Sequence, residues 1–131
     1  MFWNIMGNNY LAFARKLKKI GEDNGIHCNQ SHAPFPVYCK EIRDHLKRAI
    51  ECSAEAGAKI CVIHPDNNKN AQENAEMFLE LIPFANEHGV TIATENMWNW
   101  DKEKDQSSFA ACATPKSFCD HVDTAKGIVA C

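Results

Sequence analysis

Four glycines divide the sequence into units of similar length. Gly25, Gly57, Gly89 and Gly127 are spaced by 32, 32 and 38 residues, and each follows a polar stretch and opens a short apolar segment. A glycine just past a helix end takes up the left-handed backbone conformation that other residues adopt only at a steric cost. The spacing therefore predicts repeated helix–strand units, with strands in the segments 25–32, 57–64, 89–95 and 127–131.

Amphipathic helices are predicted between these segments. Pro83 falls inside the third, and we expect it to kink or interrupt that helix. The fourth is weaker and opens at Thr114-Pro115, an N-cap residue followed by proline at the first helical position. Apolar residues recur at helical spacing in the first three: Tyr10, Phe13, Ala14, Leu17 and Ile20; Ile42, Leu46, Ala49 and Ile50; and Met77, Phe78, Leu81, Ile82 and Ala85.

Helices and strands that alternate with this period form right-handed βαβ units around a parallel sheet. A chain of 131 residues suits a single domain, so we treat residues 1–131 as one unit. Two architectures remain open, a doubly wound open sheet and an arc of a β/α barrel, and the period alone does not separate them.

Composition excludes several classes of protein. The sequence is 45% hydrophobic and 24% charged, which is typical of globular domains. It has no apolar run near the roughly 18 residues that a membrane span needs and no signal-peptide start, so we expect a cytoplasmic protein. The net charge is -3 and the basic residues are interspersed with acidic ones, so we expect no nucleic-acid partner.

The seven cysteines stand at positions 28, 39, 52, 61, 112, 119 and 131, and no two of them form a C-x-x-C pair. A structural zinc site prefers such close pairs, and a disulfide framework prefers a secreted protein. We therefore expect most of the cysteines to be buried or half-buried free thiols.

Chemistry-bearing residues stand at equivalent places in three successive units. Counting from each glycine, the seventh residue is His32 in one unit and His64 in the next, and the sixth residue in the third unit is Glu95. The carboxyl ends of parallel strands share one edge of a sheet, which is where α/β proteins place their sites. Imidazole and carboxylate ligands together suit a divalent ion such as zinc or manganese.

The residues around these positions favour a site. Prolines follow both histidines closely and turn the chain sharply, in Ser31-His32-Ala33-Pro34 and in His64-Pro65-Asp66. After Glu95-Asn96, about a dozen polar or small residues precede the next helix, and a loop of this length is often a lid. Its tryptophans, Trp98 and Trp100, have two open interpretations: they stack on a sugar and exclude water, or they cover the barrel mouth or a neighbouring helix.

Three strings resemble the xylose-isomerase-like barrel superfamily: Asn29-Gln30-Ser31-His32-Ala33-Pro34-Phe35, Val62-Ile63-His64-Pro65 and Ala93-Thr94-Glu95-Asn96-Met97. The resemblance runs from about Tyr10 to the last residue and is greater to the sugar phosphate isomerase/epimerase branch than to the endonuclease IV branch. It implies a partial (β/α)8 TIM barrel of about four parallel βα units, truncated before closure.

The resemblance also implies a role for each residue. Glu95 matches the carboxylate that ends the fourth barrel strand, where it binds metal and moves a proton. His64 and His32 match the histidines that end the third and second strands; they line the substrate pocket in the isomerase branch and bind metal in the endonuclease branch. Asn96, Trp98 and Trp100 are expected to contact the substrate. The implied reaction is proton transfer next to a carbonyl through a metal-bound enediolate, with Mn, Zn, Co or Mg as cofactor.

The sequence departs from the family pattern in its extent. A complete barrel takes roughly 250 residues and eight strands, and the family's later ligands, an aspartate, a histidine and a glutamate, have no counterpart here. The chain is expected to be truncated or incomplete, or to self-associate through exposed strand edges. Four functions stay open: an isomerase or epimerase on a small carbohydrate, a non-catalytic fragment or assembly partner, an abasic-DNA endonuclease, and an open-sheet binding module.

Overall fold

The computed structural model describes residues 9–37 and 41–130. It contains a four-stranded parallel sheet in the order β1-β2-β3-β6, formed by β1 (Gln30–His32), β2 (Ile60–Val62), β3 (Thr91–Thr94) and β6 (Val129–Ala130). The helices between these strands are α2 (Tyr10–Asp23), α3 (Ile42–Ala56), α4 (Ala71–Glu87) and α5 (Pro115–Ala125). The resemblance also implies a remnant of the first barrel strand near Phe2–Ile5, and this segment lies outside the described residues.

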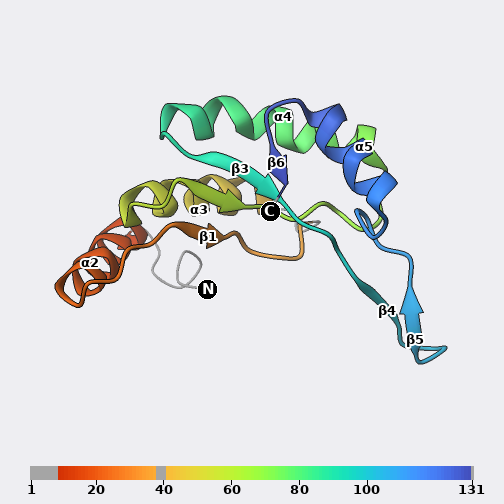
Figure 1. The fold of residues 1–131 in the computed structure, drawn as a ribbon, viewed down its shortest axis with the longest axis horizontal. Helices are drawn as coiled ribbons and strands as arrows, with labels where there is room; N and C mark the ends of the chain where they lie inside the picture. The colour runs from red at the N-terminus through yellow and green to blue at the C-terminus, as the bar shows by residue number, and fades with distance from the viewer. Residues whose placement is uncertain (1–8, 38–40, 131) are drawn as a thin grey trace.

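The connectivity favours a barrel arc over a doubly wound sheet. Each strand is added beside the previous one without a reversal of order. Each helix packs on the next along the chain, and α3 and α4 also pack on the sheet (Figure 1). A doubly wound sheet instead reverses its strand order and divides its helices between two faces. The predicted α/β fold, a partial TIM barrel of four parallel strands, is therefore confirmed.

The main core lies between the sheet and these helices. Leu46 and Ile50 from α3 and Phe78 and Leu81 from α4 are fully buried, as are Ile92 in β3 and Ile63 directly after β2. Burial of a large aliphatic or aromatic side chain of this kind contributes about 1.5–3 kcal/mol each. The predicted apolar faces of α3 and α4 thus supply a large part of the core.

The four glycines predicted to end helices all have positive φ. At Gly57, which follows α3 with φ 88, the backbone N–H donates to Ala54 and the next N–H, from Ala58, donates to Ser53. These bonds satisfy carbonyls that the helix leaves unpaired at its end. The four regularly spaced glycines therefore mark the places where helices end.

The structure narrows one helix prediction and corrects another. Helix α4 continues through Pro83 to Glu87, so of the two expected effects, a kink or an interruption, the interruption is absent. Pro83 has no N–H to donate to the carbonyl of Leu79, four residues earlier in the helix. Both residues are exposed, so water can hydrate that carbonyl. In α2, Leu17 and Ile20 were expected on a buried face but are 44% and 49% exposed, because no described residue covers that end of the helix.

The segment after β3 differs most from its prediction. We expected a single long loop before the last helix. The chain instead forms an antiparallel hairpin of β4 (Asn99–Asp101) and β5 (Gln106–Ser108), which projects away from the body of the protein (Figure 1). Asp101 Oδ1 accepts hydrogen bonds from the backbone N–H groups of Glu103 and Lys104 and so stabilises the turn.

Candidate functional site

The sheet register places the three predicted residues on one face. His32 lies opposite Val62 in β2, and Val62 lies opposite Ala93 in β3. Side chains two residues apart along an extended chain point to the same face. His64 is two residues beyond Val62, and Glu95 is two residues beyond Ala93. Both side chains therefore lie on the same face as His32, away from the helices, at the carboxyl end of the sheet.

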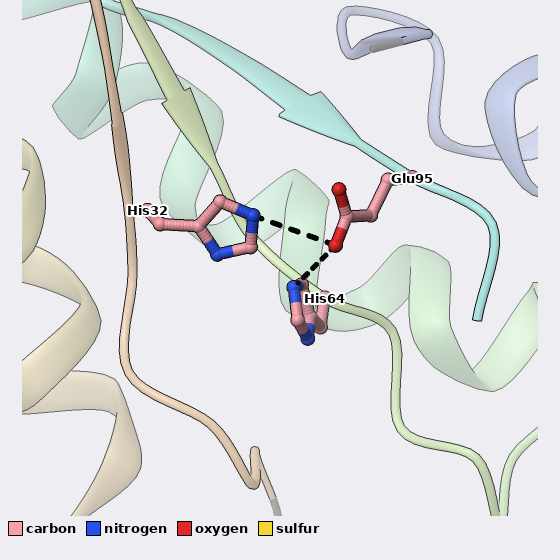
Figure 2. Close-up of side chains that lie close together, drawn as sticks. All are labelled: His32, His64 and Glu95. Carbon is pink, nitrogen blue, oxygen red and sulfur yellow. Dashed lines mark ion pairs between the residues drawn. The ribbon is translucent and has the colours of Figure 1, made fainter. Parts of the chain in front are cut away.

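The three side chains converge on one point (Figure 2). His64 Nε2 lies 2.8 Å and His32 Nε2 lies 3.4 Å from the same oxygen, Glu95 Oε1. One ligand atom from each residue lies within 4.8 Å of the others. The two imidazole rings meet edge to face, with centroids 4.7 Å apart. Three protein ligands around one point is a common arrangement in catalytic sites for divalent metals.

His64 is largely buried and faces Glu95. Its side chain is 13% exposed, and Nδ1 is buried without a polar partner among the described residues. Nε2 lies 2.8 Å from Glu95 Oε1, which makes an ion pair when His64 is protonated. When His64 is neutral, both atoms have a lone pair to offer to a cation between them.

Burial also sets the protonation state of His64. Desolvation lowers the pKa of His64 below its ordinary value, and the negative charge of Glu95 only partly offsets this effect. The imidazole is therefore neutral at neutral pH, with a lone pair to share. A neutral imidazole and a carboxylate are the forms that bind a divalent ion, so this donor set fits one.

A cavity of about 650 Å³ adjoins the cluster at His64, whereas neither His32 nor Glu95 lines it. His64 forms part of its wall, Phe35 comes from the loop after β1, and Trp98 and Trp100 come from the hairpin. Trp98 is 77% and Trp100 46% exposed, so neither is a core residue. Asn96 is exposed and does not line this cavity. The structure thus places His64 and the two tryptophans at one cavity and leaves Asn96 outside it.

Sequence reasoning did not identify the polar network that holds the loop after β2. Asn74, buried in the first turn of α4, donates to the carbonyls of Asp66 and Lys69 and accepts from the Asp66 N–H. Its amide also lies 3.2 Å from Nε2 of His121 in α5. Because His121 Nδ1 contacts the Ser117 carbonyl at 2.7 Å, Nδ1 carries the proton and Nε2 accepts from Asn74.

The class that this fold and cluster define is a β/α-barrel arc with a candidate metal centre at the carboxyl ends of its strands. The family model that matches the chain, over residues 3–130, is described as a xylose isomerase-like TIM barrel. The chain belongs to this family.

Solved structures of similar fold include enzymes named for sugars. A D-tagatose 3-epimerase-like protein is 21% identical, with a TM-score of 0.66 over 83% of this chain. A sugar phosphate isomerase/epimerase from Parabacteroides distasonis is 16% identical, with a TM-score of 0.56 over 89%. A xylose isomerase-like TIM barrel/4-hydroxyphenylpyruvate dioxygenase fusion protein is 15% identical, with a TM-score of 0.61 over 89%.

The chain spans 45%, 46% and 19% of the tagatose-epimerase-like protein, the Parabacteroides protein and the fusion protein, respectively. At these identities the likeness concerns the fold. A search of curated proteins found no match. In the described part of the chain, no helix is both long and apolar enough to cross a bilayer.

Proposed function

We propose that this chain carries part of the active site of a metal-dependent sugar isomerase or epimerase. His32, His64 and Glu95 would hold a divalent ion (Mn, Zn, Co or Mg), and the adjoining cavity would hold the carbohydrate. The observation that carries the proposal is the approach of both histidine Nε2 atoms to one oxygen of Glu95. Two of the similar folds are named as a sugar epimerase-like protein and a sugar isomerase/epimerase, which supports the substrate class.

A divalent ion, when bound, would polarise a substrate carbonyl and make the neighbouring C–H more acidic. The proton transfer itself would be carried out by a residue of the chain. Glu95 Oε1 faces the two histidines, while Figure 2 shows its second oxygen directed away from both rings. We propose that this second oxygen would accept the proton from the substrate carbon and return it to the adjacent position.

The cavity wall supports a carbohydrate ligand. Trp98 and Trp100 stand two residues apart and both line the cavity. Exposed indole rings offer flat apolar surfaces on which the C–H face of a sugar can lie, and they displace water from the reacting carbon. We propose that these two residues form the sugar-binding wall, with Asn96 in a more distant contact.

The direct test is metal-dependent turnover. The purified chain is incubated with Mn²⁺ and a panel of ketoses and ketose phosphates, and products are resolved by chromatography. Interconversion that requires Mn²⁺ and disappears in the Glu95→Gln variant is expected for an isomerase. Turnover that persists in the Glu95→Gln variant would remove Glu95 from the reaction.

A non-catalytic role is favoured by a separate observation. The candidate centre has one carboxylate among the described residues, and the chain spans 45% of the tagatose-epimerase-like protein. In this alternative the chain binds metal but acts only with a partner that supplies further strands and ligands. Metal binding without turnover of any sugar would favour it over catalysis by the chain alone.

A further inference from the structure

The hairpin that carries the tryptophans is weakly attached to the rest of the fold. Its two strands pack chiefly on each other, and an internal bond links the Asn99 side chain to the Phe109 carbonyl. Phe109, at the end of the returning leg, is 71% exposed, whereas the next two residues, Ala110 and Ala111, are buried. The position of the hairpin residues that line the cavity therefore depends on contacts at the hairpin's base.

One side chain contacts both legs of that base. Asn67 Oδ1 accepts a hydrogen bond from the backbone N–H of Ala111, at 3.0 Å, on the returning leg. Its Nδ2 donates to the carbonyl of Trp98, at 3.5 Å, on the outgoing leg. The two contacts have different strengths, because the first is short and the second is at the limit of a hydrogen bond.

Asn67 belongs to a firmly held segment. It follows His64 by three residues and lies between Asp66 and Lys69, the two residues whose carbonyls accept from Asn74 in α4. The same short loop thus begins at a candidate metal ligand and ends at the first turn of a core helix. A displacement of the hairpin relative to this loop would displace Trp98 and Trp100 relative to His64.

We propose that Asn67 is a positioning residue that fixes the hairpin, and with it the sugar-binding wall of Trp98 and Trp100, relative to His64. This inference rests on the proposed function for the identity of the ligand. The two hydrogen bonds between Asn67 and the base of the hairpin do not depend on that function. Asn67 itself does not act on the reacting atoms.

Two substitutions test the two hydrogen bonds of Asn67 separately. Asn67→Ala removes both contacts. Asn67→Asp keeps an oxygen that accepts from the Ala111 N–H, but it loses the donor to the Trp98 carbonyl and places a negative charge beside it. Asn86→Ala is the matched control, because Asn86 is an exposed amide in the last turn of α4.

The first experiment measures amide hydrogen exchange of the full chain by NMR. In Asn67→Ala the Ala111 amide should exchange roughly tenfold faster, as expected for the loss of one net hydrogen bond. Asn67→Asp should leave Ala111 protected. Tryptophan fluorescence quenching by acrylamide should rise in both variants and be unchanged in Asn86→Ala. Unchanged Ala111 exchange in Asn67→Ala would overturn the proposal.

The second experiment separates a positioning role from a general structural one. Mn²⁺ binding by calorimetry should stay within about twofold of wild type in Asn67→Ala, because the three proposed ligands are untouched. Binding of D-fructose to the Mn²⁺-loaded chain should weaken roughly tenfold. A parallel loss of Mn²⁺ affinity would show that Asn67 only supports the loop and would overturn the positioning role. Failure of wild type to bind Mn²⁺ would refute the proposed function and leave the exchange result standing.

Discussion

Nε2 of His64 lies 2.8 Å from Oε1 of Glu95. His64 is two residues beyond Val62 and Glu95 is two residues beyond Ala93, and Val62 and Ala93 are paired in neighbouring strands. The same oxygen of Glu95 lies 3.4 Å from Nε2 of His32. Polar atoms that converge on one point at the carboxyl ends of parallel strands are typical of a site arranged for a ligand.

The lowered pKa of His64 makes the stability of the metal-free chain depend on pH. The unfolded chain binds a proton near the ordinary value of 6.5, whereas the folded chain resists protonation until a lower pH because His64 is desolvated. The unfolded state therefore binds more protons in this window, and stability is lost as the pH falls below about 6.5.

Urea unfolding at a series of pH values measures this effect. The fall in unfolding free energy below pH 6.5 should be smaller in His64→Gln than in wild type, after metal is removed with a chelator. Equal pH profiles for the two proteins would show that His64 is not responsible. His88→Gln is the control, because His88 lies at the end of α4, away from the site.

Asn74 is expected to contribute more to stability than a typical helix residue. It is 1% exposed and links α4 to the loop after β2 and to His121 in α5. Asn74→Ala would leave buried backbone groups without partners, at a cost of about 1–3 kcal/mol. Thermal unfolding should show the loss, and a change within experimental error would mean that water replaces the amide.

Cysteine reactivity should follow burial. Cys28 and Cys119 are exposed, whereas Cys52, Cys61 and Cys112 are buried. Burial raises the pKa of Cys52 to about 12 and that of Cys112 to about 11, so little reactive thiolate forms at neutral pH. Among these five described cysteines, alkylation with iodoacetamide, read by peptide mapping, should label positions 28 and 119 before the other three. Early labelling of Cys61 would contradict the packing of the sheet against α3.

The open edges of the sheet predict self-association. In the described residues, β1 and β6 each pair on one side only, and Val129 in β6 is 41% exposed. Unpaired strand edges promote pairing between chains. We propose that two copies associate through these edges, and the mass measured by light scattering should rise with concentration. A clean monomer at micromolar concentration would contradict this proposal.

Much of the fold could be predicted because its signals are local. Gly57 ends a helix through its own backbone conformation, and Thr114 begins one by accepting from the N–H of Ser117, three residues later. The approach of His32, His64 and Glu95 could be predicted as well, since parallel strands bring equivalent positions to one edge.

Other features could not be predicted because they depend on distant contacts. His121 accepts from Asn74, 47 positions away, and a helical histidine gives no local sign of such a partner. The hairpin lacks the alternating apolar pattern by which strands are recognised, and its turn depends on Asp101 and on the positive φ of Asp105. The exposure of Leu17 likewise depends on what covers α2, which helical periodicity does not report.

Calorimetric titration of the metal-free chain with Mn²⁺ measures whether His32, His64 and Glu95 form a divalent-metal site. One site is expected in wild type. Glu95→Gln removes the carboxylate of this cluster while keeping its shape, so its affinity for Mn²⁺ should fall by at least about 1.4 kcal/mol, or roughly tenfold. No binding by wild type, or equal binding by the two proteins, would contradict the proposed metal site.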